Sequence, residues 1–320
     1  MAMPSPRAGP AFALQAVLEG DRATPHPQHR PYTANLMKIG AMLQETLTLL
    51  RAWEGEPRDA FTRRILETNL VGKTTRVRLA DLLGRVFWRR FPLHGHPGLA
   101  DASAFVRYDR GADASRLVAL YHAATAEPLL YDLLMAFSGP GTDTPFGQDG
   151  ASRLRERATA GLLATEDVVA FVRQRGGATV RDWSPNTMKR TARGALAALR
   201  DFGVLSGRAR KTLTSDLPVP LSTFLYVAHA LRAEASGARD LALSPHWGIF
   251  LLTPADVELL FLQAHAAGHL RYYRLSDVWR IDWVHADLSA LVAALAAPAS
   301  DGTADRHSIN GEATTPHAHR

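Results

Sequence analysis

The sequence of 320 residues contains no cysteine. This absence excludes disulfide bonds, zinc sites built on thiolates and cysteine nucleophiles, and it fits the reducing cytoplasm. Long hydrophobic runs are also missing, because charged residues and prolines interrupt the most apolar stretches, residues 115–137 and 246–265. Neither stretch supplies the roughly 20 apolar residues of a membrane span. We therefore expect a cytoplasmic protein with no membrane partner.

A complete nucleotide-binding loop is lacking as well. The tripeptide Gly72-Lys73-Thr74 could end such a loop, but the loop needs a glycine five residues earlier, where the chain has Glu67. The preceding residues 61–70 have apolar residues at helical spacing, whereas this loop normally follows a buried strand. A nucleotide-binding enzyme that uses Lys73 is therefore only a minor alternative.

Other catalytic and metal-binding patterns are incomplete. No Gly-x-Ser-x-Gly motif occurs, and no pair of carboxylates suggests a tuned acid and base. His265 and His269 are spaced as metal ligands on one helical face, but position 266 is alanine, not the glutamate of a zinc-protease helix. His94 and His96 have no third ligand nearby. We expect no enzymatic activity, no metal site and no cofactor.

Positive charge is abundant and concentrated. The whole chain carries a formal net charge of +6, from 37 lysines and arginines against 31 acidic residues. Residues 58–90 contain nine basic and three acidic residues, and residues 173–211 contain ten and two, so each window carries at least the surplus of the whole chain. Such concentration favours a polyanionic partner, although a solvated basic surface stays open as an alternative.

The remaining pattern is mainly helical, with apolar residues at helical spacing over residues 34–53 and 78–91. Glycines and prolines cluster at residues 138–150 and indicate a linker. We predict a mainly α protein of two helical domains with small β-hairpins. The predicted divisions are disordered tails at 1–30 and 297–320, an N-terminal helical domain at 31–138, a linker at 139–151 and a C-terminal helical domain at 152–296.

The C-terminal domain is expected to have winged helix-turn-helix character. Ser184 is a good helix N-cap and Pro185 suits the first helical position. The helix that follows has a buried stripe and a polar, basic front, ends near Gly203, and is followed by short β-prone pieces around a basic tip, residues 207–211. Helix, turn, basic helix and basic hairpin follow one another in this order in a winged helix. Residues 269–285 predict another hairpin.

These patterns give a set of candidate DNA contacts. Asn186 and Thr187 are candidates for base edges, and hydroxyl groups at residues 74 and 75 can donate to phosphate from a helix start. The full set of predicted DNA-binding residues is Lys73, Thr74, Thr75, Arg76, Arg78, Asn186, Thr187, Lys189, Arg190, Arg193, Arg208, Arg210 and Lys211.

Three segments together carry a family resemblance. They are YTANLMKIGAMLQETLTLLRAW, ETNLVGKTTRVRLADLLGRVFWRRF and DWSPNTMKRTARGALAALRDFGVL. In order and character they resemble the BrxA family of BREX phage-defence systems, over roughly residues 32–295. The resemblance implies a mostly helical protein without known enzymatic activity that binds double-stranded DNA and works beside the methyltransferase and other BREX components. Members are sometimes labelled inner-membrane proteins, and the hydropathy of this chain argues against that label.

We therefore expect a non-enzymatic DNA-binding accessory protein of a BREX-type system, with mostly sequence-nonspecific phosphate contacts. The main alternative is an assembly protein whose basic faces dock other defence subunits.

Overall fold

The computed structural model of the protein describes residues 30–36, 40–93, 97–109, 113–139, 148–215 and 217–297. The predicted tails therefore lie, apart from residues 30 and 297, outside the described residues. His94 and His96 also lie outside them.

All the regular elements in the first half of the described chain are helices. Its elements are α3 (Leu43–Ala52), α4 (Arg58–Thr68), α5 (Arg76–Leu82), the π-helical turn η2 (Leu83–Phe87), α6 (Trp88–Arg90), α7 (Leu99–Tyr108), α8 (Asp113–Ala126) and α9 (Pro128–Ser138). The helix expected at 78–91 is present as α5, η2 and α6, with its apolar face buried.

The helix expected over residues 34–53 is interrupted. Gly40 and Met42 have left-handed backbone conformations, with φ of 53° and 47°, and α3 begins only at Leu43. A left-handed residue cannot continue a right-handed helix. The carbonyl groups freed at Gly40 and Ala41 accept hydrogen bonds from the buried guanidinium of Arg90, at 3.4 and 2.5 Å. Arg90, distant in the sequence, thus bonds two carbonyl groups that the apolar spacing predicts to be bonded within a continuous helix.

The second half adds two small antiparallel sheets to further helices. Its elements are α10 (Gln148–Thr159), α11 (Thr165–Arg175), α12 (Gly177–Arg181), α13 (Pro185–Asp201), β1 (Leu205–Ser206), β2 (Thr212–Leu213), α14 (Leu221–Arg232), α15 (Ala238–Ala242), the 3-10 helix η3 (Pro245–Phe250), α16 (Pro254–Ala266), β3 (Leu270–Leu275), β4 (Val278–Trp283) and α17 (Leu288–Ala296). The predicted mainly α fold with small β-hairpins is confirmed, including the hairpin at residues 269–285.

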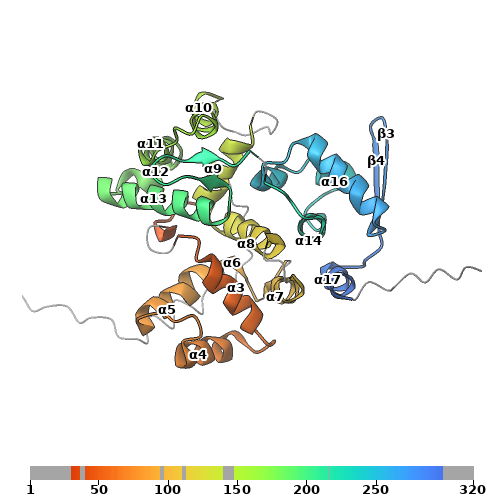
Figure 1. Ribbon diagram of the computed structural model, residues 1–320, viewed down its shortest axis with the longest axis horizontal. Helices are drawn as coiled ribbons and strands as arrows, with labels where there is room; N and C mark the ends of the chain where they lie inside the picture. The colour runs from red at the N-terminus through yellow and green to blue at the C-terminus, as the bar shows by residue number, and fades with distance from the viewer. Residues whose placement is uncertain are drawn as a thin grey trace, which may run out of the picture.

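The two halves meet around α8 and α9 (Figure 1). Helix α14 packs on α8, α17 on α7, and both η3 and α10 on α9. Consequently α9 is buried along almost its whole length. The buried apolar side chains of the described residues form one continuous cluster. The division at residues 139–151 stays a prediction, because residues 140–147 lie outside the described parts of the chain.

Candidate nucleic-acid interface

Helix α13 begins where its sequence predicts. The hydroxyl oxygen of Ser184 accepts a hydrogen bond from the backbone N–H of Thr187, at 3.1 Å, and Pro185 occupies the first helical position. The cap satisfies one of the N–H groups left free in the first turn, and proline has no N–H to lose there. The helix ends at Asp201, and Gly203 follows with φ of 82°. The predicted helix and its stop are confirmed.

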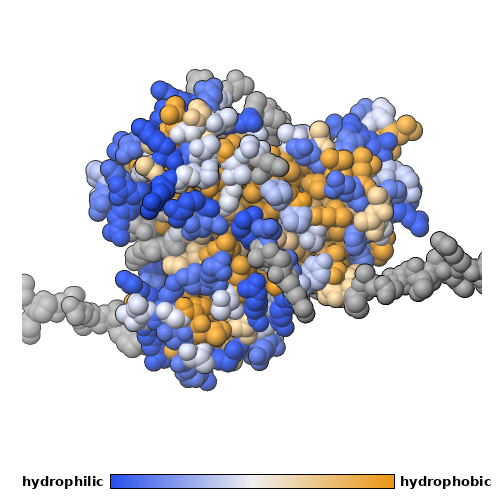
Figure 2. All heavy atoms as spheres, viewed as in Figure 1, coloured by the Kyte–Doolittle hydropathy of each residue, from blue (hydrophilic) through white to orange (hydrophobic). Residues whose placement is uncertain are grey.

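The two faces of α13 differ in character. Its buried face consists of Met188, Thr191, Ala192, Ala195, Leu196, Ala198 and Leu199 and packs against α11. Four polar side chains of its first three turns are exposed, namely Asn186, Lys189, Arg190 and Arg193. Figure 2 shows hydrophilic side chains gathered on the left of the view, where Figure 1 places α11, α12 and α13. The packing therefore fixes which side of α13 meets solvent, and that side is basic.

Counter-charges near this basic face are few. Lys189 Nζ lies 3.6 Å from Glu166 Oε1, in a pair whose two side chains are largely exposed. Such surface pairs contribute little and yield easily to another anion. Arg190 and Arg193 form no ion pair with another residue of the described ranges. Their guanidinium groups can meet an external anion without losing an internal partner.

A short hairpin stands directly after α13. Leu205 pairs with Leu213 and Ser206 with Thr212, and the tip runs through residues 207–211. Gly207 has φ of 88°, and a Cβ atom there would lie 2.4 Å from the carbonyl oxygen of Arg210. Only glycine fits this turn without displacing backbone. The tip exposes the side chains of Arg208 and Arg210.

Lys211 has a different role from the other predicted phosphate ligands. Its side chain is 6 % exposed, and its ammonium donates hydrogen bonds to the carbonyl oxygens of Gly207, at 2.9 Å, and Arg208. Desolvation, with a smaller effect of the Arg200 cation, lowers its pKa. Lys211 holds the tip of the hairpin together instead of presenting charge to solvent.

The hairpin is tied to the chain segment before α11. Leu163 forms an antiparallel bridge with Lys211, and Arg210 donates to the carbonyl oxygen of Leu162 at 3.1 Å. The backbone at Leu163 therefore lies antiparallel to the chain just before β2, as a third strand of a single residue. Along the chain the elements of this region are α10, the bridge at Leu163, α11, the short helix α12, the long helix α13 and the β1–β2 hairpin. This bridge could not be predicted from the sequence, because a single residue gives no strand pattern.

The N-terminal basic window is arranged around the start of α5. Thr75 is the N-cap of this helix, and its hydroxyl oxygen accepts from the N–H of Arg78 at 3.2 Å. The Arg78 guanidinium donates to the hydroxyl of Thr74 at 3.3 Å. Arg76 and Arg78 are exposed. The predicted helix start is thus present, with two exposed arginines in its first turn.

Lys73 is engaged inside the protein. Its Nζ atom lies 2.5 Å from Glu45 Oε1, and its side chain is about one-fifth exposed. The side-chain amide of Asn69 closes the loop by bonding both the N–H and the carbonyl oxygen of Lys73, each at 2.8 Å. Hydrogen bonding to Lys73 lowers the pKa of Glu45 against the opposing effect of burial. The lysine therefore joins this loop to α3.

The two basic windows are separate in space. Figure 1 shows α5 in the lower left of the molecule and α13 in the upper left. A shared ligand would have to extend from one to the other. The predicted contacts omit two arginines of the second window, Arg173 and Arg181, which are both exposed near the start of α13.

No three histidine or acidic side chains of the described ranges lie close enough together to hold a metal ion. The Nδ1 atom of His265 accepts a hydrogen bond from the N–H of Tyr272 at 3.3 Å. The Nδ1 atom of His269 lies 3.4 Å from the Nε2 atom of His285. His269 lies outside α16, so the expected one-face spacing does not exist. Burial, with a smaller effect of His285, lowers the pKa of His269.

Within the described ranges, no helix is by itself both apolar and long enough to cross a membrane. Residues 238–250 and 254–266 satisfy the length and composition together, but the two segments are bent by 109°.

Comparison with known proteins gives one family. Residues 30–137 match the BrxA family, which confirms the suspected resemblance over this part of the chain. The match supports a BREX-associated defence protein. No curated protein and no solved structure matches the chain.

Proposed function

We propose, from the match of residues 30–137 to the BrxA family, that the protein is a non-enzymatic accessory of a BREX-type phage-defence system that binds double-stranded DNA. It would act in the cytoplasm beside other BREX components such as the methyltransferase. The observation that carries DNA binding is the exposed basic face of α13 beside a hairpin tip with two exposed arginines. A polyanion is the partner that such a surface fits best.

The order of elements supports a winged helix-turn-helix. Helix α10, the bridge at Leu163, α11, α13 and the β1–β2 hairpin follow one another as the elements of that motif do. In this interpretation α13 is the helix that enters the major groove, and residues 207–211 form the wing. The small helix α12 occupies the turn between α11 and α13.

The proposed contacts follow from exposure. Asn186 and Thr187, in the first turn of α13, are the proposed base readers, whereas the exposed cations contact phosphates. The proposed phosphate ligands are Arg76, Arg78, Lys189, Arg190, Arg193, Arg208 and Arg210. The side chains of Lys73 and Lys211 are largely buried as well as held by internal acceptors, so we assign them to positioning the loops that carry these ligands.

Few base readers and many phosphate ligands predict weak sequence preference and strong salt dependence. Each neutralised phosphate releases counterions, so contact of about five phosphates by the five cations of α13 and the hairpin should give a slope near −4.5 of log affinity against log salt, and a steeper slope results where Arg76 and Arg78 reach the same duplex. We expect this slope with a labelled random-sequence duplex of about 30 base pairs, measured by fluorescence anisotropy across a salt series.

The deciding variants reverse charge on one surface at a time. Lys189→Glu/Arg193→Glu should weaken binding at least about tenfold and flatten the slope by roughly two, because two phosphate contacts are lost and two repulsions gained. Arg76→Glu/Arg78→Glu tests the N-terminal surface without placing a second carboxylate beside Glu45, as a change at Lys73 would. A matched control is Arg239→Glu/Arg271→Glu, which reverses two exposed charges elsewhere and should leave the slope unchanged. Wild-type protein that does not bind the duplex at low salt would refute the proposal.

Assembly with other defence subunits is the second candidate, and exposed apolar side chains favour it. Leu275 and Val278 at the end of the β3–β4 hairpin are 81 % and 70 % exposed, and Leu259 and Leu262 of α16 are about half exposed. Figure 2 shows hydrophobic side chains gathered on the right of the view, where Figure 1 places α14 and α16. Exposed apolar surface of this kind is typical of protein interfaces. If Leu275→Asp/Val278→Asp abolishes co-purification with the methyltransferase while DNA binding is unchanged, assembly takes place through this end.

A further inference from the structure

A pocket of about 450 Å³ lies beside the start of α13. Seven residues line it, contributed by the last turns of α11, by α12, by the turn after it and by the first turn of α13. They are Arg173, Gly177, Val180, Arg181, Trp183, Pro185 and Met188. The volume is within the range of small-ligand sites and is sufficient for one nucleotide.

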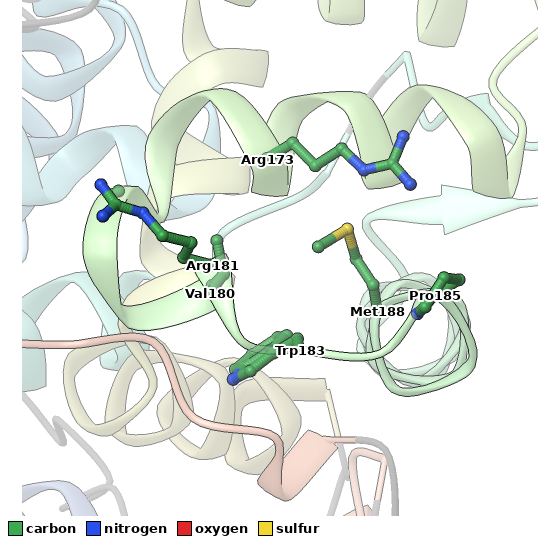
Figure 3. Close-up of a pocket in the computed structure, with 7 residues that line it drawn as sticks. Arg173, Val180, Arg181, Trp183, Pro185 and Met188 are labelled. Atoms are coloured by element: carbon green, nitrogen blue, oxygen red, sulfur yellow. The ribbon is translucent and has the colours of Figure 1, made fainter.

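The pocket combines an apolar floor with an aromatic wall. Val180 and Met188 are buried, and Figure 3 shows Met188 pointing into the space between α11 and the first turn of α13. Trp183 is half-buried and lies edge-on in this view, so that one face of its indole turns to the pocket. Within the described parts of the chain no other aromatic ring stacks on Trp183. A flat aromatic group can therefore occupy that face.

Positive charge stands at both ends of the pocket. Figure 3 shows Arg173 reaching from α11 and Arg181 from α12 to opposite sides in this view, with the Arg181 guanidinium directed away from Trp183. Neither arginine forms an ion pair with another residue that the structure describes, and both are exposed. Guanidinium groups bind phosphate through paired N–H donors. Because both side chains are exposed and form no ion pair within the described residues, they can turn toward a ligand in the pocket, and the site then fits an aromatic ring flanked by an anionic group on each side.

We propose that this pocket binds a nucleotide that carries a phosphate on both its 5′ and 3′ sides, with its base on Trp183 and its phosphates on Arg173 and Arg181. Every nucleotide inside a strand has this chemistry, and so does a free nucleoside 3′,5′-bisphosphate. A mononucleotide with one phosphate would leave one arginine unmatched. The pocket borders the first turn of α13, so a DNA strand bound there could place one nucleotide, turned out of the duplex, in the pocket. This source of the nucleotide rests on the proposed DNA-binding function.

The first test uses the free ligand, which does not depend on DNA binding. Deoxyadenosine 3′,5′-bisphosphate, deoxyadenosine 5′-monophosphate and deoxyadenosine are titrated into the full chain by calorimetry. We expect the bisphosphate to bind tightest and the nucleoside weakest. Trp183→Ala should weaken bisphosphate binding by about tenfold or more, because stacking on an aromatic ring supplies a large share of single-strand affinity. Trp183→Phe keeps an aromatic face and should retain most of it.

A charge variant distinguishes the loss of a ligand contact from misfolding of the Trp183→Ala variant. Arg173→Gln/Arg181→Gln changes two exposed side chains and should weaken the bisphosphate much more than the nucleoside. The matched control, Arg190→Gln/Arg193→Gln, removes the same charge from the outer face of α13. It should weaken perfect-duplex binding and leave bisphosphate binding unchanged.

The second test identifies the source of the nucleotide. A duplex with one unpaired adenine is compared with the perfect duplex by anisotropy. If DNA is the source, the wild type prefers the unpaired adenine and Trp183→Ala loses that preference while it still binds the perfect duplex. If the source is a free nucleotide, the bisphosphate binds and the duplex preference is absent. The proposal is overturned if wild type that binds duplex neither binds the bisphosphate nor prefers the unpaired base, or if such binding survives both pocket variants.

Discussion

At the residue scale, two basic side chains of the same hairpin have opposite roles. The Lys211 ammonium is buried against the carbonyl oxygens of Gly207 and Arg208, whereas the Arg208 side chain is exposed at the tip. A buried charge–carbonyl hydrogen bond stabilises the turn, and an exposed arginine is available for an anion. Their contributions to stability and to DNA affinity should therefore separate.

We predict that Lys211→Met lowers the free energy of unfolding by about 1–3 kcal/mol, because carbonyl groups of the tip lose their donor. Arg208→Met should leave thermal stability within about 0.5 kcal/mol of wild type and reduce the salt slope by about one. Urea denaturation and the anisotropy salt series measure the two effects. Equal stability loss in both variants would show that Lys211 does not hold the tip.

At the scale of elements, the β1–β2 hairpin depends on one glycine. Gly207→Ala places a Cβ atom 2.4 Å from the Arg210 carbonyl in a residue whose φ is 88°, so the backbone of the tip has to shift. Gly268→Ala is the control, since φ there is 78°, no atom lies within 4 Å of the added carbon, and the residue lies outside the basic surfaces and the pocket. We predict that both variants lose about 1 kcal/mol to backbone strain and that only Gly207→Ala also weakens duplex binding. Equal duplex affinity for the two variants would exclude the hairpin from the interface.

Elements whose signals are local could be predicted from the sequence. The sequence predicts helix α13 because its cap, its first proline and its apolar stripe all lie at or next to its own residues. The β3–β4 hairpin is predicted for the same reason, since both strands and their turn lie within residues 269–285. Engagement by distant partners could not be predicted. Glu45, which holds Lys73, lies 28 positions earlier in the chain, and the pairing of Leu163 with Lys211 joins residues almost fifty apart. The basic residues were thus found, but which of them are free was decided by tertiary contacts.

At the scale of the whole molecule, a buried histidine connects the two halves of the chain. His122 of α8 bonds the hydroxyl of Tyr226 on α14 at 2.9 Å through Nε2, and the carbonyl oxygen of Arg90 at 3.0 Å through Nδ1. Complete burial lowers the pKa of His122 to about 4, against a smaller opposing effect of its backbone hydrogen bond. The folded protein therefore keeps this imidazole neutral where the unfolded chain, with a pKa near 6.5, already binds a proton.

Acid should consequently weaken the junction between α8 and α14. Because the unfolded state binds the extra proton between pH 6.5 and 4, stability from this group is complete above pH 6.5 and falls as the pH decreases. The expected loss between pH 7 and pH 5 is about 2 kcal/mol. His122→Gln, which can bond both partners but does not titrate, should show a correspondingly smaller fall in Tm over the same range. Near-UV circular dichroism and calorimetry at both pH values measure this fall.

The same measurements test the predicted division at residues 139–151. A single unfolding transition that shifts as one unit with pH means that the halves unfold together, and two transitions mean that each half is an independent domain.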